Sequence, residues 1–303
     1  VPCCINISFS FSIIGLVDGV DWSSYNDRLV REVDVIFDVG LVGSFFAKRL
    51  GRLGRGRPQV YGDAAISALA VLRAYFNLPY RQTEGLARRF ACLLGLERVP
   101  DYTTIFRREK GLKVPTSLRP GGPGEGVVIA IDATGWKVTN RGEWKRQGRK
   151  GWVKLHIAVN VKTKEILSVR LTDERVHDRE AAEPLVKEAR QRIHPVKLLA
   201  DGAYDSKELF NLLQELDIEP VIRVRKDSSR LARGCPARRR AVLAQQQPGW
   251  QKRLGYGMRW LVETAFSTLK RRFGEFLRAT KQIYAFQEML IKCFVYNLLI
   301  RYR

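Results

Sequence analysis

The sequence predicts a mixed α/β domain that follows a small all-helical domain, and three observations support this prediction. Apolar residues between about 63 and 111 recur at helical spacing. A stretch rich in proline and glycine follows. Beyond it, short apolar runs alternate with helical patterns, as in sheets covered on both faces. The expected divisions are an N-terminal segment with a basic connector (1–60), a helical domain (61–113), a Pro/Gly linker (114–126) and an α/β domain (127–303).

The 61–113 domain is expected to contain three helices, at 64–76, at 81–94 and from Asp101 onward. Asp101 follows Pro100 and is of the residue type that caps helix N-termini. The arrangement resembles a helix-turn-helix whose last helix enters the major groove of DNA. We therefore expect Arg107 and Arg108 to contact DNA. An ordinary helical bundle is the alternative.

The 127–303 segment has the element order of an RNase H-like core, the core found in retroviral integrases. Three neighbouring strands, a crossover helix, a further strand and a late helix follow one another. The expected strands are 127–131, 153–160, 165–172, 196–200 and 220–224, and the expected helices are 178–190, 206–216 and 256–273. Residues 283–300 are expected to form a packing helix, because Glu288 and Lys292 make them a poor membrane span.

The charge of the chain indicates a polyanionic partner. Its 53 Lys and Arg against 31 Asp and Glu give a net charge of +22. Residues 223–303 alone hold 19 Lys and Arg against 4 Asp and Glu. Such an excess favours nucleic acid, because phosphate neutralisation releases counterions. The hydrophobic content of 45% excludes a simple basic tail.

The cysteines indicate a reducing compartment. The five cysteines form no CxxC pair, and they have no zinc-ligand spacing with the three histidines. Residues 1–17 alternate like a strand and lack the basic start of a secretion signal. We therefore expect a cytoplasmic location.

Three acidic residues are candidates for a metal site. Asp132 and Asp201 each follow a buried apolar run, at the sheet edge where ligand sites of α/β folds gather. Glu263 lies on the predicted 256–273 helix. Carboxylates without neighbouring His or Cys favour Mg²⁺ or Mn²⁺. Three of them are enough for two ions about 3.5–4 Å apart, as in phosphodiester transfer. Each Asp alone is more often a turn cap, but the three together in a basic protein favour the metal site.

Glu263 also belongs to a Y-x2-R-x3-E-x6-K pattern formed with Tyr256, Arg259 and Lys270. At about 100° per residue these side chains share one narrow stripe of a helix. An acid flanked by bases suits a metal ligand beside phosphate-binding groups. A solvated charge stripe is the alternative, and Arg271 extends the cationic line.

These residues resemble the three signature regions of DDE transposases of prokaryotic insertion sequences. The regions are Ile131-Asp132-Ala133-Thr134-Gly135, Asp201-Gly202-Ala203-Tyr204 and the Tyr256–Lys270 pattern, supported by His177-Asp178 before the crossover helix. The pattern is most similar to insertion-sequence family five, in the Y-R-E-K signature class. The resemblance covers about residues 60–303.

The resemblance implies a function for each of these positions. Asp132, Asp201 and Glu263 would be the catalytic, metal-binding triad, and Tyr256, Arg259 and Lys270 would hold DNA phosphates. The reaction would be hydrolysis at the terminal inverted repeats, followed by attack of the freed 3′-hydroxyls on target double-stranded DNA. Because two ends are cut and joined together, we expect a homodimer on DNA.

Two other functions remain open from the residues alone. One is an RNase H-like metal-dependent nuclease without strand transfer, and the other is a non-catalytic DNA-binding protein. Around the triad, we expect Arg225 and Arg238–Arg240 to lie on a loop that faces DNA. Trp136, Trp144 and Trp152 are expected to pack rather than to stack on an unpaired base.

Overall fold

A computed structural model describes residues 60–93, 98–115, 126–138, 152–225 and 227–301, together with Ser23, Asn26, Asp27 and Val30. Our expectations for residues 1–17, for most of the basic connector and for most of the Pro/Gly linker lie outside the described residues.

The α/β part is built on a six-stranded sheet with the order β3-β2-β1-β4-β5, and β6 pairs with the far end of β1. The strands are β1 (Val127–Val138), β2 (Trp152–Asn160), β3 (Ile166–Asp173), β4 (Pro195–Ala200), β5 (Glu219–Ile222) and β6 (Phe276–Leu277). Strands β1, β2 and β3 form an antiparallel meander. Strands β4 and β5 run parallel to β1. This is an RNase H-like core, and the expected fold class is confirmed.

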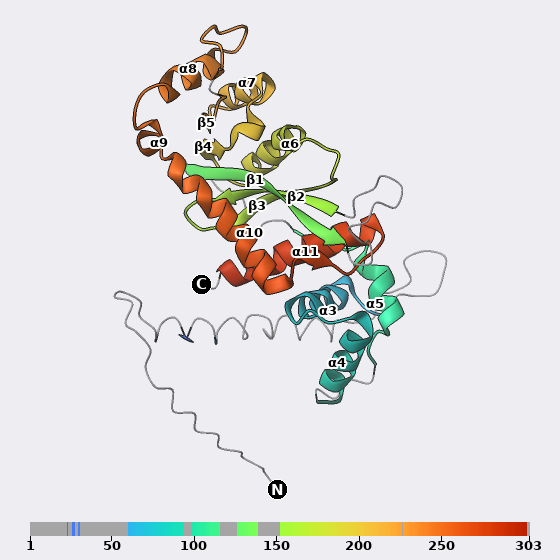
Figure 1. Cartoon of the computed structure of the whole chain (residues 1–303). Coiled ribbons are helices and arrows are strands. Elements are labelled where there is room, and N and C mark those ends of the chain that lie inside the picture. Colours follow the sequence, from blue (N-terminus) through green and yellow to red (C-terminus); the bar gives the residue numbers. More distant parts are fainter. Residues whose placement is uncertain are drawn as a thin grey trace.

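Helices cover both faces of the sheet (Figure 1). Helices α6 (Asp178–Arg190) and α7 (Lys207–Glu215) pack through Ala182, Val186 and Phe210 on Ile129, Ile131 and Leu198. Helices α10 (Trp260–Phe273) and α11 (Gln282–Arg301) pack on the opposite face, where Ala130, Leu155 and Leu199 point. The period-2 alternation along β1 therefore sends neighbouring side chains into two separate cores.

Strand β1 is longer than the sequence indicated. We expected it to end at Asp132, but it continues to Val138. Its pairing with β4 stops after Ala130, whereas its pairing with β2 continues to Lys137. Asp132 therefore lies in the middle of a strand, just beyond the point where the parallel neighbour ends. The Asp132 side chain still lies at an edge of the sheet, because β4 has ended and β1 has lost that neighbour at this position.

The predicted 256–273 helix is also different in the structure. Tyr256–Arg259 form a 3₁₀ turn, η3, and the α-helix begins only at Trp260. Gly255 precedes the turn with φ 69°, and Gly257 lies within it. Glycine is a poor helix former, and the tighter turn changes the spacing of the stripe. Met258, which lies within this turn, is exposed.

Two short helices were missed in the region between Asp201 and Glu263. They are α8 (Pro236–Gln245) and α9 (Trp250–Arg253). Arg238–Arg240 therefore lie on a helix and not on the loop that we expected. The pattern was hidden because α8 is rich in arginine and alanine and has little apolar periodicity.

The N-terminal helices are α3 (Asp63–Tyr75), α4 (Tyr80–Leu93) and α5 (Tyr102–Glu109). The predicted N-cap is confirmed, since the Asp101 carboxylate accepts a hydrogen bond from the Thr104 amide at 2.6 Å. A buried ion pair between Arg73 and Glu109 joins α3 to α5, and the Tyr80 hydroxyl donates to Glu109 at 3.1 Å. These contacts fix the three helices to one another.

Helix α3 shares a hydrophobic core with the α/β part. Its residues Ala70 and Leu72 belong to the same cluster as Leu269 of α10 and Met289 of α11. Helix α11 is the one described helix that is long and apolar enough to cross a membrane, and most of it is buried inside the protein. The Asn297 amide of α11 bonds to the backbone of Ile166 at 2.9 and 2.7 Å. This supports the expected role of α11 as a packing helix.

Candidate active site

The site is assembled by β1, the turn after β4, and the junction of η3 with α10. Asp132 is on β1, Asp201 follows β4, and Glu263 is in the first turn of α10. Asp132 and Glu263 are joined by one cation. The Arg259 guanidinium donates to Asp132 Oδ2 at 3.3 Å and to Glu263 Oε1 at 2.6 Å. Two of the three predicted ligands therefore lie on either side of a single guanidinium.

Asp201 is oriented by its own turn. Its Oδ1 accepts a hydrogen bond from the Ala203 amide at 2.9 Å, and it caps the 3₁₀ turn η2 (Gly202–Tyr204). Asp132 has a similar local bond, from the Ala133 amide at 2.8 Å. The turn-capping alternative is thus correct for Asp201, yet it leaves oxygen atoms available on the same carboxylate.

The electrostatics of Asp132 show that the other two acids act on its carboxylate. The pKa of Asp132 is raised from 3.8 to about 6, first by burial and then by the charges of Asp201 and Glu263. The Ala133 amide and Arg259 oppose this shift by favouring the charged form. Arg259 alone does not balance the three carboxylates, so the site favours an additional cation.

The donor set fits divalent metal ions, but the side chains are not yet arranged as ligands. Among the residues that the structure describes, no group of three or more Asp, Glu, His or Cys side chains is close enough to hold a metal. Glu263 is turned toward Arg259, and its side chain is 55% exposed. An exposed i, i+4 ion pair is weak, about 0.3–0.5 kcal/mol, so Glu263 can leave Arg259 at small cost.

The other residues of the predicted stripe are divided between two places. Tyr256 lies at the site: its pKa is raised by burial, lowered by Arg259 and Arg223 and raised by Asp201. Lys270 lies two turns beyond Glu263, with its Nζ 5.4 Å from the centre of the Trp136 ring. Arg271 is exposed beside it. The cations thus form a line that leads away from the carboxylates along α10.

The two arginines predicted on α5 differ in their surroundings. Arg107 is exposed on a helix whose first residues also face solvent. Arg108 bonds to the Tyr61 carbonyl and forms an ion pair with Asp63. Arg107 is therefore the more accessible of the two for DNA, while Arg108 fastens α5 to the start of α3.

A polar network around the buried His156, on the strand next to β1, was not recognised from the sequence. The Lys154 ammonium lies 2.8 Å from the Asp178 carboxylate at the start of α6. His156 donates to or accepts from the Thr172 hydroxyl at 2.9 Å, and burial lowers the pKa of His156 to about 4. The exposed His177, which the sequence singled out, lies outside this network. The signal in the sequence was Lys154 and His156, two polar residues of one face in an otherwise apolar strand.

Tyr204 is close enough to this network and to the carboxylates to be affected by the charges of both. Its side chain is fully buried, and its pKa is raised by burial and then by the charges of Asp178, Asp132 and Asp201. His156 pairs across the strands with Ala133, the residue that orients Asp132. The Lys154–Asp178 pair therefore joins the start of α6 to β2, the strand next to the one that holds Asp132.

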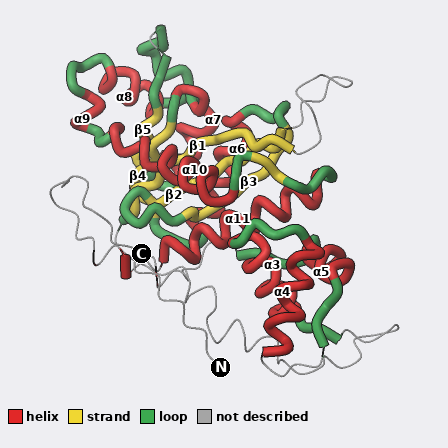
Figure 2. Tube along the Cα trace, turned by 60° about the horizontal axis from the view of Figure 1, so that its bottom comes forward, coloured by secondary structure: helices red, strands yellow, loops and turns green. Residues whose placement is uncertain are grey.

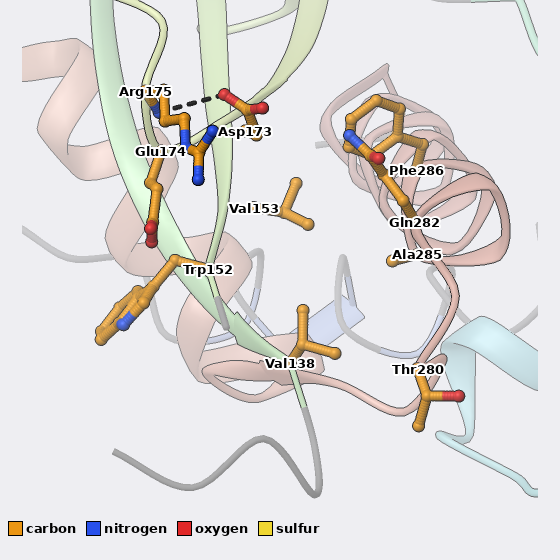
Figure 3. A pocket seen from close by; sticks show the side chains of 10 residues that line it. All are labelled: Val138, Trp152, Val153, Asp173, Glu174, Arg175, Thr280, Gln282, Ala285 and Phe286. Carbon is orange, nitrogen blue, oxygen red and sulfur yellow. Dashed lines mark hydrogen bonds between the residues drawn. The ribbon is translucent and has the colours of Figure 1, made fainter. Parts of the chain in front are cut away.

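The predicted packing role of the tryptophans is confirmed for Trp136 only. Trp136 is buried and donates to the Gly274 carbonyl at 3.0 Å. Trp152 is 39% exposed and lies beside a hollow of about 280 Å³ between β2 and the start of α11 (Figure 3). The β1 residue that lines this hollow, Val138, is six residues along the strand from Asp132, or roughly 20 Å. Trp144 lies outside the described residues.

Family models identify the class of protein to which this site belongs. Residues 123–298 match a family described as transposase DDE domain, and residues 32–141 match a second model with the same description. The first match covers more than half of the chain, and the chain therefore belongs to the transposase DDE domain family. It is a DDE-type DNA transposase, an enzyme of DNA cleavage and strand transfer. Enzymes of this type generally use divalent metal ions.

Solved structures with some likeness include other transposases. A piggyBac transposase synaptic complex with hairpin DNA is 12% identical, with 91% of this chain and 74% of that chain covered and a TM-score of 0.44. The Drosophila P element transposase strand transfer complex is 15% identical, with 65% and 43% covered and a TM-score of 0.31. A pre-cleavage Mos1 transpososome is 10% identical, with 94% and 89% covered and a TM-score of 0.24. Scores this low do not carry the assignment, which rests on the family match.

Asp132 gives a first prediction, on stability in the absence of divalent ions. Its folded pKa is raised, so its ionised form destabilises the fold above about pH 6, and this effect vanishes below about pH 4. Asp132→Asn should therefore stabilise the metal-free protein at pH 8 by about 1–3 kcal/mol. Thermal unfolding at pH 8 and pH 4.5 measures the difference.

The matched control for this experiment is Asp217→Asn, which neutralises an exposed carboxylate away from the site. It should leave the melting temperature nearly unchanged at both pH values. An equal gain from Asp132→Asn at pH 8 and pH 4.5 would contradict the electrostatic explanation.

Proposed function

We propose that this transposase acts at the terminal inverted repeats of a prokaryotic insertion sequence of family five, with Asp132, Asp201 and Glu263 as the catalytic, metal-binding residues. The observation that carries the proposal is the shared guanidinium of Arg259. It brings Glu263 of α10 beside Asp132 of β1, and the charge of Asp201 acts on the same carboxylate. The excess negative charge fits two Mg²⁺ or Mn²⁺ ions.

Bound divalent ions would supply activation of the attacking oxygen and stabilisation of the leaving oxygen. The protein's own residues position the reactants. Asp132 and Asp201 are held by backbone amides, and the Lys154–Asp178 pair joins β2 to the start of α6 beside them. With Asp132 and Glu263 holding the ions, Arg259 would be available to bind a DNA phosphate.

The basic residues around the site are proposed to bind DNA. Tyr256 and Arg259 lie beside the carboxylates, and Lys270 and Arg271 continue along α10. Arg107 on α5, and Arg108 after release of Asp63, would contact the terminal repeat. Because two transposon ends are processed together, we propose a homodimer on double-stranded DNA. Its proposed location is the prokaryotic cytoplasm, at the nucleoid.

The test uses the protein with a duplex that carries the inverted repeats flanking its gene. In Mg²⁺, the protein should cut at the repeat boundary, free a 3′-hydroxyl and join that end to a second duplex. Cutting without joining would favour the nuclease. Binding without cutting would contradict the catalytic assignment, and no binding would contradict the repeat assignment.

A further inference from the structure

A strongly cationic hollow of about 470 Å³ lies outside the carboxylate site. It is formed by the chain between β5 and α8 together with the start of α7. Five cationic side chains and one acidic side chain line it: Lys207, Arg225, Arg233, Arg238, Arg239 and Asp227. Such an excess of positive charge in a concave surface favours an anionic ligand.

Several of these cations are held in place by groups that do not cancel their charge. The Lys207 ammonium donates to the Arg233 carbonyl at 3.2 Å, and the Arg239 guanidinium donates to the Arg230 carbonyl at 3.2 Å. Within the part of the chain that the structure describes, Arg225 and Arg233 make no side-chain hydrogen bond or ion pair. The hollow therefore contains positioned cations with donors still available.

Two serine hydroxyl groups in the hollow are further hydrogen-bond donors for a phosphate. The Ser228 hydroxyl accepts from Arg238 at 3.0 Å, and the Ser229 hydroxyl accepts from the Leu231 amide at 3.2 Å. Each hydroxyl keeps its own hydrogen to donate. Arginine, lysine and serine donors are the usual partners of DNA phosphates. The left-handed backbone of Arg233 (φ 44°) is a costly conformation for a non-glycine residue, which is typical of functional loops.

The hollow and the carboxylate site are reached from the same edge of the sheet. Strands β4 and β5 are paired up to Ala200 and Ile222, so that Asp201 and the chain leading into the hollow leave the same sheet edge. Four residues after Asp201, Asp205 binds Arg238 through two hydrogen bonds of 2.6 and 2.8 Å. A DNA strand on the carboxylates can therefore continue into the hollow along one edge.

The N-terminal helices lie at the opposite end of the molecule. Both overall views place α8 at one end and α3, α4 and α5 at the other, with β1 and α10 between them (Figures 1 and 2). If α5 binds the terminal repeat, DNA near α8 lies on the other side of the scissile phosphate. That DNA is either the donor flank before cleavage or the target at strand transfer.

We propose that this cationic hollow binds the phosphate backbone of DNA beyond the transposon end, across the scissile phosphate from the DNA bound by the N-terminal helices. The inference rests on the proposed function. It adds a second DNA-binding surface. This surface would hold DNA outside the transposon, whereas the N-terminal helices would hold DNA inside it.

The test compares wild-type protein with Arg225→Ala/Arg233→Ala, two exposed positions whose truncation breaks no described side-chain bond. Binding is measured for a terminal-repeat duplex without a flank and for one with a flank of about one helical turn, ~10 base pairs. Wild type should bind the flanked duplex more tightly. The variant should lose that gain, roughly tenfold or more at ~100 mM salt, and its salt slope should be smaller by about 2.

The charge-matched control is Arg170→Ala/Lys187→Ala. These exposed cations lie on β3 and on α6, over the opposite edge of the sheet. The control should keep the gain from the flank. A second experiment measures the rate at which pre-cleaved ends are joined to a target duplex. If the Arg225→Ala/Arg233→Ala variant is defective only in this joining, the hollow binds target DNA.

The outcomes separate this inference from the proposed function. Wild type that neither cuts nor joins overturns the proposed function itself. The hollow is not a DNA site if the wild type cuts and joins and the variant keeps both the affinity gained from the flank and the joining rate. Loss of either one in the variant supports it.

Discussion

Replacing Glu263 with glutamine should lower divalent-ion-dependent cleavage at the transposon end by about 1000-fold or more, while binding of the end stays within about threefold. The carboxylate is proposed as a metal ligand, and the ions supply several kcal/mol of transition-state stabilisation. Glutamine has nearly the same shape and lacks the charge. Because Glu263 is half exposed, its replacement should leave the fold intact.

The matched control for this variant is Glu215→Gln at the exposed C-terminal end of α7. It should cleave at the wild-type rate. Single-turnover cleavage and equilibrium binding, measured on the same duplex, separate loss of chemistry from loss of binding. Retained cleavage by Glu263→Gln would remove Glu263 from the catalytic set.

Replacing Arg259 with alanine should change metal binding and cleavage in opposite directions. In the structure Arg259 stands as the cation between Asp132 and Glu263, so it competes with divalent ions for both carboxylates. Its removal should strengthen divalent-ion binding to the DNA-free protein by about tenfold. Cleavage should nevertheless fall by about 100-fold, because a charged donor to the reacting phosphate is lost.

Titration calorimetry with Mn²⁺ and single-turnover cleavage measure the two effects of Arg259→Ala. Lys252→Ala removes one exposed positive charge from the neighbouring α9 and should change neither quantity by more than about twofold. Weaker Mn²⁺ binding by Arg259→Ala would mean that the guanidinium supports the metal site and does not compete with it.

The fold was predictable because its strands and helices obey simple periodicities. The apolar runs at 127–131 and 196–200 lie in β1 and β4, and the Asp101 cap begins α5 as expected. The exact end of β1 was not predictable, because it depends on which neighbour continues to pair. Helix α8 was missed because tertiary contacts such as Arg238 with Asp205 stabilise it, and its own sequence has little amphipathic pattern.

The candidate site could be selected from the sequence as a set of residues, but its arrangement could not. Charge and spacing selected Asp132, Asp201 and Glu263, and in the structure the charges of Asp201 and Glu263 raise the pKa of Asp132. Arg259 was expected on one helical line with Glu263, whereas the 3₁₀ turn lets it bridge to β1. The network of Lys154, His156 and Asp178 requires knowledge of which strands are neighbours, which no single stretch of sequence contains.

The most direct test of the catalytic assignment is anomalous diffraction from crystals of the protein bound to its transposon end in Mn²⁺. We predict Mn²⁺ peaks within about 2.0–2.3 Å of carboxylate oxygens of Asp132, Asp201 and Glu263, with Arg259 moved to a DNA phosphate. Peaks away from these three side chains, or an Arg259 that still joins Asp132 to Glu263 beside bound DNA, would contradict the assignment.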